Sequence, residues 1–238
     1  MSAKKLVDAD GQKKAAAIAA LKYVENGMVI GLGTGSTANH FIRALGAKVK
    51  KGFAVIGIPT SKDTADLATS LGIKLGTLND NPFIPFTFDG VDEFDGDFRL
   101  IKGGGGALLI EKMVATSSKF VVTIADSSKQ VKVLGKFPLP VEIVPVGIKA
   151  TAWKIEKAFD MCGMKPKMTL RNRDGKLFRT DAGNCIIDCA CGEIKQPDRI
   201  EVMLNNIPGV VNNGLFNGIS GIIFVGKPDG TVEELRRG

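Results

Sequence analysis

Hydrophobic residues in the first part of the chain follow two different spacings. Short apolar runs, which are typical of buried strands, occur at 28–32, 53–58, 74–77, 85–88, 98–101 and 120–125. Apolar residues three and four positions apart, which predict helices, occur at 12–24, 39–45, 63–71 and 107–116. Strands that alternate with helices in this order favour a mostly parallel sheet with helices on both of its faces.

The pattern changes after the segment 136–140, which contains two prolines. Strands are predicted at 141–146, 167–171, 184–191 and 209–216, and helices at 150–162 and 197–206. The resulting order, βαββαβ, is the split arrangement of ferredoxin-like domains. A last apolar strand at 221–225 is expected to return to the first sheet.

These elements predict an α/β protein: a Rossmann-like, mostly parallel sheet interrupted by a small α+β ferredoxin-like domain. Residues 1–135 and 217–238 are expected to form the α/β domain, which carries the chemistry, and residues 136–216 the small domain. A chain of 238 residues, 44% of them apolar, can bury a sizeable core in one large domain or two modest ones.

The formal net charge of +7 admits nucleic acid, a membrane surface or an anionic small molecule as partner, besides an ordinary basic surface. The lysines are scattered and aromatic residues make up only 6%, which argues against nucleic acid. No run of about 18 apolar residues occurs, and residues 1–14 are too polar for a secretory signal, so no membrane partner is expected. The four cysteines are expected to be reduced thiols in a cytoplasmic protein.

A glycine-rich loop, residues 31–38, follows the first predicted strand and precedes a helix. Glycines such as Gly35 let the backbone approach a ligand, the helix start offers unpaired N–H groups, and Thr34, Ser36 and Thr37 add hydroxyl donors. A dinucleotide site would need an acidic residue about 20 positions further on, and a P-loop would need a Gly-Lys-Ser/Thr ending. Neither is present, so the loop predicts an anion site, with a plain tight turn as the alternative.

A cluster of carboxylates, residues 89–95, is predicted at the carboxyl end of a strand, the edge where parallel sheets bind ligands. Asp89 and Asp92 could hold sugar hydroxyls, perform acid–base work or bind a hard metal. The segment lacks the ligand pattern of an EF-hand loop, so a metal is not expected. A solvated, inert turn is the equally simple alternative.

Four consecutive glycines follow Lys102 and precede a helix that carries Glu111. The amides around Gly103 and Gly104 can converge on a developing oxyanion, and Lys102 adds a positive charge. Glu111 lies among apolar residues, where desolvation could raise its basicity. A flexible linker and a surface glutamate are the alternatives. With the anion loop and the aspartates, this segment predicts proton abstraction next to the carbonyl of a phosphorylated sugar.

At these positions the chain closely resembles type A ribose-5-phosphate isomerases. The likeness runs in order from Lys13 to about Gly230. It rests on the segments 31–38, 89–93, 102–107, 125–129, 135–142 and 207–211.

The resemblance implies interconversion of ribose 5-phosphate and ribulose 5-phosphate without a metal or an organic cofactor. It implies that Glu111 is the base that carries a proton between C2 and C1, and that Asp89 assists opening of the sugar ring. Asp92 and Lys102 would handle hydroxyl protons and the charge of the enediolate. Residues expected to contact the substrate or its phosphate are Lys13, Thr34, Gly35, Ser36, Thr37, Gly103, Gly104 and Lys129. A homodimer or homotetramer is also implied, with the small domain in its contacts.

Three features depart from the resemblance or lie outside it. Alanine in place of Gly106 also looks familiar in the family, and we expect no consequence because that position would fall at the helix start. The strand 185–191 carries three cysteines that alternate onto one face, as core residues would, and their spacing matches no familiar zinc site. His40, the only histidine, is expected to be structural.

Three other functions share parts of this pattern. A coenzyme A transferase on a related fold would use a glutamate nucleophile, but the chain length, the anion loop and the aspartates weigh against it. A sugar-phosphate sensor would bind without turnover, but the chain has no recognisable helix-turn-helix segment and a sensor would not require Lys102 with Glu111. A nicotinamide-binding protein lacks its ribose-binding carboxylate.

Overall fold

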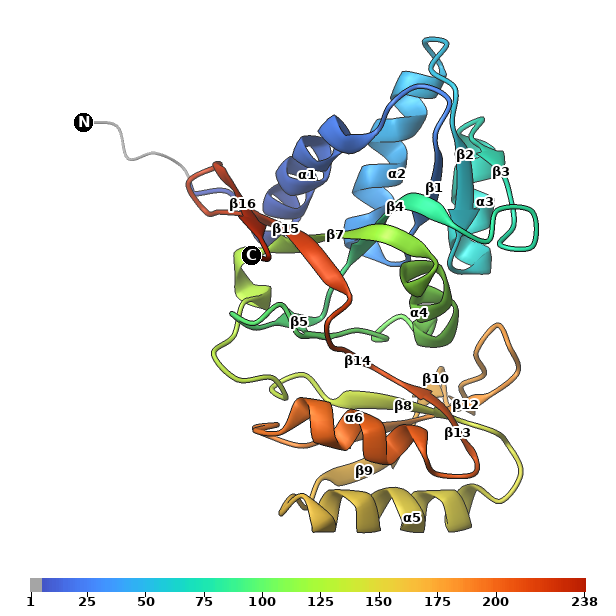
Figure 1. The fold of residues 1–238 in the computed structure, drawn as a ribbon, viewed down its shortest axis with the longest axis vertical. Helices are drawn as coiled ribbons and strands as arrows, with labels where there is room; N and C mark the ends of the chain where they lie inside the picture. Colours follow the sequence, from blue (N-terminus) through green and yellow to red (C-terminus); the bar gives the residue numbers. More distant parts are fainter. Residues whose placement is uncertain (1–5) are drawn as a thin grey trace. The chain divides into compact units, whose positions relative to one another are not determined.

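A seven-stranded sheet forms the centre of the first of two compact units in the computed structural model, which describes residues 6–238 (Figure 1). This unit comprises residues up to Val91, Ile110–Gln130 and Gly218–Gly238. The strands, in spatial order, are β16 (Val232–Arg236), β15 (Ser220–Gly226), β7 (Ser118–Asp126), β4 (Ile84–Gly90), β1 (Val29–Leu32), β2 (Ile56–Pro59) and β3 (Lys74–Leu75). All neighbours are parallel except β15 and β16, which confirms the mostly parallel sheet and the return of the strand predicted at 221–225.

Helices cover both faces of this sheet, as predicted. The helices of the unit are α1 (Ala9–Ala20), with the short 3-10 turn η1 (Leu21–Tyr23), α2 (Ser36–Val49), α3 (Lys62–Ser70) and α4 (Leu108–Thr116). On β1, Ile30 and Leu32 face a hydrophobic cluster that includes residues of α1 and α2. Gly31 between them faces the other way, where a Cβ atom would lie 2.6 Å from Cγ1 of Val114 on α4. The alternation of side chains along a strand therefore places α4 on the opposite face.

Side-chain caps fix the start of two of these helices. Asp8 Oδ1 accepts a hydrogen bond from the Gly11 amide at 2.8 Å, and Ser61 Oγ accepts one from the Thr64 amide at 3.2 Å. Helix α2 differs, because it begins after Gly35 and no side chain caps it. Its first amides are therefore left for another acceptor.

The second unit, Asp92–Leu109 and Val131–Asn217, has the predicted ferredoxin-like core. Its antiparallel sheet has the order β13 (Val210–Asn213), β8 (Leu139–Ile143), β12 (Cys185–Ala190), β9 (Lys167–Leu170). The helices α5 (Ile148–Met161) and α6 (Pro197–Asn205) share one hydrophobic cluster with Cys185, Ile187 and Cys189. Cys185 and Cys189 are buried core residues, as predicted, whereas Cys191 is partly buried against the same cluster. A hairpin of β10 (Asn172–Arg173) and β11 (Lys176–Leu177) is an addition that the sequence pattern did not predict.

The strand predicted at 98–101 is not part of the parallel sheet. It forms β6 (Leu100–Ile101), which pairs antiparallel with β5 (Glu93–Phe94) and β14 (Leu215–Phe216) in a small separate sheet. The strand predicted at 209–216 breaks in two at Gly214, where a Cβ atom would lie 2.4 Å from the Lys102 carbonyl oxygen. Because of these pairings residues 92–109 group with the second unit, whereas the sequence pattern placed everything up to residue 135 in the first.

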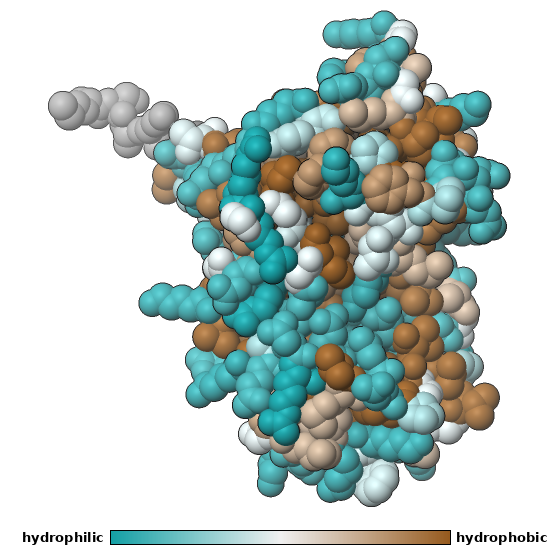
Figure 2. All heavy atoms as spheres, in the orientation of Figure 1, coloured by the Kyte–Doolittle hydropathy of each residue, from teal (hydrophilic) through white to brown (hydrophobic). Residues whose placement is uncertain are grey.

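The face drawn in Figure 2 is largely hydrophilic, and its hydrophobic residues lie in separate groups. Among residues 6–238 no helix has both the length and the apolar character needed to span a bilayer.

Candidate functional site

The predicted anion loop joins β1 to α2. Gly35 has a φ of 100°, which favours glycine, and it turns the chain directly into the helix. Gly35 and Ser36 are exposed, whereas Thr37 is buried. The exposed start of an uncapped helix of 14 residues attracts negative charge, because its dipole and its free amides point the same way.

Asp89 lies against this loop at the carboxyl end of β4. Its Oδ1 accepts hydrogen bonds from the amides of Thr34 at 3.1 Å and of Gly90 at 2.7 Å, and the residue is only 3% exposed. Gly33 makes the approach possible, since a Cβ atom there would lie 2.0 Å from Asp89 Oδ1. The structure therefore brings together two of the predicted motifs, which are more than 50 residues apart in sequence.

Two predicted lysines lie on other elements of the same unit, and Lys13 contacts the loop. Lys13 on α1 is half-buried and donates a hydrogen bond from Nζ to Ser36 Oγ at 3.3 Å, whereas Lys14 is exposed. Lys129 is half-buried at the end of η2 (Ser127–Lys129). The buried side chain of Gln12 links the two elements, because its Oε1 accepts hydrogen bonds from the amide and the hydroxyl of Ser127 at 3.2 and 2.8 Å. Gln12 was not predicted from the sequence, because nothing in the pattern around Lys13 marked it as a functional residue.

A cluster of hydroxyl groups, also missed from the sequence, holds Thr34. Thr34 Oγ1 lies 2.7 Å from Thr60 Oγ1, 2.8 Å from Ser61 Oγ and 3.2 Å from Thr64 Oγ1. The Thr64 hydroxyl donates in turn to the Gly33 carbonyl at 2.8 Å. The sequence did contain a signal for this cluster. Residues 60–61 directly follow β2, the parallel neighbour of β1, and the carboxyl ends of parallel strands meet at one edge of the sheet.

Glu111 lies in the first turn of α4 and is 3% exposed. A negative charge is favoured at that end of a helix by the helix dipole, while burial disfavours it. Buried carboxylates and helix starts are both found where proteins tune a group for proton transfer.

Four predicted residues lie in or against one tight turn of the second unit. The Gly104 amide donates a hydrogen bond to Asp92 Oδ2 at 2.8 Å. Gly103 has a φ of 100°. Lys102 is 5% exposed, and its ammonium group lies 5.7 Å from the centre of the Phe216 ring. Asp92, Lys102 and the glycines are thus fixed relative to one another by the same few backbone atoms.

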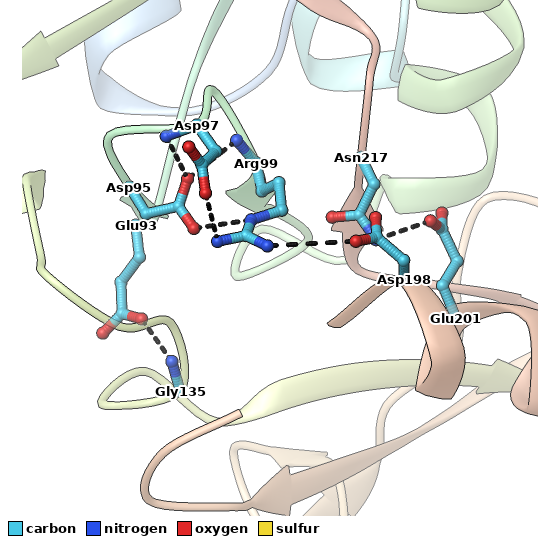
Figure 3. Close-up of polar contacts among 8 residues, drawn as sticks. All are labelled: Glu93, Asp95, Asp97, Arg99, Gly135, Asp198, Glu201 and Asn217. Carbon is cyan, nitrogen blue, oxygen red and sulfur yellow. Dashed lines mark hydrogen bonds and ion pairs between the residues drawn. The ribbon is translucent and has the colours of Figure 1, made fainter. Parts of the chain in front are cut away.

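The other carboxylates of the segment 89–95 are structural. Glu93 accepts hydrogen bonds from the amides of Gly135, at 2.8 Å, and Phe137. Asp95 accepts from Arg99 Nε at 2.7 Å, and Arg99 also pairs with Asp97 (Figure 3). No group of three residues suited to hold a metal ion is found among residues 6–238.

Two remaining predictions have different outcomes. His40 lies on α2 and its Nε2 pairs with Asp10 Oδ1 at 2.9 Å, a contact that lowers the pKa of Asp10 and agrees with a structural role. The expectation for Gly106 is wrong. Helix α4 begins at Leu108, Gly106 has a φ of 91°, and a Cβ atom there would lie 2.4 Å from Cζ of Phe178.

Comparison with known proteins adds a second line of evidence on the family and function of this chain. The family model of ribose 5-phosphate isomerase A (phosphoriboisomerase A) matches residues 56–230. The ribose-5-phosphate isomerase A of Parvibaculum lavamentivorans is 55% identical over 226 residues, which cover 94% of this chain and 98% of that protein. That of Rhizobium meliloti is 47% identical over 224 residues, with 94% and 97% covered.

Solved structures show the same likeness in three dimensions. A D-ribose-5-phosphate isomerase in complex with phospho-erythronic acid superposes with a TM-score of 0.91 at 38% identity, covering 97% of this chain and 100% of the other. The ribose 5-phosphate isomerase of Plasmodium falciparum also has a TM-score of 0.91, at 37% identity, with 96% and 99% covered. Fold and sequence therefore agree over nearly the whole chain.

Proposed function

This chain belongs to the ribose 5-phosphate isomerase A family, and on that basis we propose how its residues divide the steps of the reaction. The chain is an aldose–ketose isomerase that interconverts D-ribose 5-phosphate and D-ribulose 5-phosphate through an enediolate, in the non-oxidative pentose phosphate pathway. Such a reaction needs a phosphate anchor, help with ring opening, a base for the C2 proton and stabilisation of the enediolate charge.

Ser36, Thr37 and the Gly35 amide anchor the phosphate at the start of α2, with the lysines Lys13 and Lys129 as point charges. The Lys13–Ser36 hydrogen bond of 3.3 Å and the absence of a side-chain cap on α2 support this assignment. Thr34 contributes by shaping the loop, because its hydroxyl is shared with the 60–64 cluster and its amide with Asp89.

Asp89 assists opening of the furanose ring by exchanging a proton with the ring oxygen or the C1 hydroxyl. The two amides on its Oδ1 hold the carboxylate in one orientation beside the anion loop. The loop holds the phosphate on C5 of the sugar. The orientation of Asp89 therefore decides whether its carboxylate reaches the ring oxygen and the C1 hydroxyl, where the ring opens.

Glu111 then removes the proton from C2 and returns it to C1. Its burial favours this role, since a desolvated carboxylate is a stronger base. Lys102 and the amides of Gly103 and Gly104 stabilise the negative charge of the enediolate, and Asp92 relays the hydroxyl protons. The buried ammonium group of Lys102 supports this, because charge stabilisation is strongest away from water.

The observation that carries the assignment is the close approach of Gly33 to Asp89, which builds the phosphate loop and a ring-opening carboxylate as one unit. The first test is conversion of ribose 5-phosphate by the purified protein in EDTA, with solvent deuterium followed into C1 of the product. Glu111→Gln is expected to lower kcat by roughly 10²–10⁴-fold with little change in KM. The matched control is Glu156→Gln on the exposed side of α5, which is expected to behave as the wild type.

A Glu111→Gln variant with near-normal turnover would refute the role of that residue. No conversion by the folded wild-type protein, even with divalent metal added, would refute the assignments as a whole and favour a binding module that lacks turnover.

We also propose a homodimer or homotetramer with contacts through the 136–216 domain, in a cytoplasmic protein. Support comes from apolar side chains exposed on its helices, namely Trp153 at 60%, Met161 at 66% and Val202 at 60%. A groove of about 430 Å³ between α5 and α6 is lined by Trp153, Met161 and Met203. Light scattering of Trp153→Glu against the wild type tests this, since a charge there should lower the assembled mass. Wild-type protein that elutes as a monomer would refute the proposal.

A further inference from the structure

Arg171, which directly follows β9, makes a set of contacts that none of the roles above uses. Its side chain is 12% exposed, and it holds Asp188 on β12 with two nitrogens, Nε lying 2.8 Å from Oδ2. The remaining nitrogen, Nη1, donates to the carbonyl oxygens of Gly103 at 2.9 Å and Gly104 at 3.2 Å. One largely buried guanidinium therefore spans the Asp188 carboxylate and the glycine turn, which lies 67 and 68 residues away in sequence.

The geometry of the peptide bond extends this contact to Asp92. The carbonyl of Gly103 and the amide of Gly104 belong to one planar trans peptide, so they point in opposite directions. The carbonyl accepts from Arg171, and the amide donates to Asp92 Oδ2 at 2.8 Å. Arg171 thus fixes the orientation of the peptide that holds Asp92, and the hydrogen bonds on its two sides strengthen each other.

The hairpin that follows Arg171 contacts the same turn. Arg173 donates to the Gly105 carbonyl at 3.3 Å, and its guanidinium lies 4.4 Å from the centre of the Phe178 ring. That ring fills the space beside Gly106, where a Cβ atom would lie 2.4 Å away. The carbonyls of Gly103, Gly104 and Gly105 are therefore all held from the side of the 171–178 segment.

We propose that Arg171 is a positioning residue for the isomerase reaction, which acts by fixing the Gly103–Gly104 peptide and, through it, Asp92. The proposal rests on the roles given above to Asp92 and to the glycine amides. A simple structural ion pair would need only Asp188 and would be satisfied by lysine. Contact with two carbonyls and a carboxylate at once needs the planar fork of arginine, which lysine cannot reproduce.

The test compares Arg171→Lys with the wild type in two assays. Turnover of ribose 5-phosphate is expected to show kcat lowered by roughly 10–100-fold with KM nearly unchanged, because misplacement of groups around the reacting atoms affects the transition state more than the ground state. Calorimetric binding of phospho-erythronic acid, whose carboxylate resembles the enediolate, is expected to weaken in parallel with kcat. Arg179→Lys is the matched control, since Arg179 is exposed and donates to the Gly183 carbonyl and to Cys185 Sγ.

A double-mutant cycle separates positioning from a general effect on folding. In an Asp92→Asn background the Arg171→Lys change is expected to weaken the binding of phospho-erythronic acid by a smaller factor than in the wild type, because the part of its effect that passes through Asp92 is already lost. An undiminished effect in that background, or wild-type kcat in Arg171→Lys, would overturn the inference. Failure of the wild-type protein to turn over ribose 5-phosphate would instead refute the proposed function, so the two failures are distinguishable.

Discussion

Replacement of Gly106 by alanine adds one methyl group where both the backbone and a neighbouring ring exclude it. The φ of 91° lies in a region that side chains disfavour, and the new Cβ atom would lie 2.4 and 2.5 Å from Cζ and Cε1 of Phe178. The left-handed conformation costs about 1–2 kcal/mol for a residue with a Cβ atom. Displacement of a packed side chain costs about 1–3 kcal/mol more. We therefore expect Gly106→Ala to lower the free energy of unfolding by about 2–5 kcal/mol.

Two further variants divide that loss into its parts. Gly163 has a φ of 71° but nothing within 4 Å of the position of its Cβ atom, so Gly163→Ala carries the backbone cost alone. Phe178→Leu in the Gly106→Ala background removes the ring and should recover part of the steric cost, with a coupling of about 0.5–3 kcal/mol between the two sites.

Thermal unfolding followed by calorimetry measures these differences. In a chain of this length each kcal/mol shifts Tm by about 2–4 °C, so Gly106→Ala should melt at least about 4 °C below the wild type. Equal Tm values for Gly106→Ala and Gly163→Ala would refute the contribution of the Phe178 ring. A Gly106→Ala protein as stable as the wild type would refute the backbone argument as well.

Three other perturbations have expected outcomes. Gly33→Ala places a Cβ atom 2.0 Å from Asp89 Oδ1 and should lower kcat/KM at least about tenfold by moving the loop from the aspartate; wild-type kcat/KM would contradict this, and exposed Gly27→Ala is the activity control. Hydrogen bonds from Lys22 and then Tyr23 lower the pKa of Glu234 to about 2, so its contribution to stability is present above its ordinary pKa and lost as pH falls towards 2. The Tm of Glu234→Gln should therefore lie below that of the wild type at pH 7, and the difference should vanish on acidification; a constant difference would contradict the cause. Burial raises the pKa of Cys191 to about 12, so iodoacetamide at pH 8 should leave it unmodified in the native protein and label it after unfolding, as peptide mass spectrometry would show.

The features that the sequence predicted are local ones. The loop 31–38 was identified because strand, glycines, hydroxyls and helix follow one another directly, and the βαββαβ order was readable for the same reason. Asp89 and Asp92 could not be separated from Glu93 and Asp95 by composition, because the partners of the latter pair, such as the Gly135 amide, are set by the fold.

The features that were missed depend on contacts between distant parts of the chain. Strand β6 was assigned to the wrong sheet because its partner β14 lies more than 100 residues later. Arg171 is one of many basic residues in the sequence, and only the folded chain shows its contact with the glycine turn. The sign of φ at Gly106 is equally invisible in a run of four glycines, each of which permits either sign.

The order of strands has a consequence for synthesis of the protein on the ribosome. In the finished sheet β15 lies beside β7, yet 93 residues separate the end of β7 at Asp126 from the start of β15 at Ser220. While those residues are being made, β7 is an open edge of a hydrophobic sheet, and such edges pair readily with other chains. The nascent chain therefore passes through a long interval in which it depends on chaperones or on fast completion, and a stalled or truncated product that ends before β15 should be recovered in aggregates.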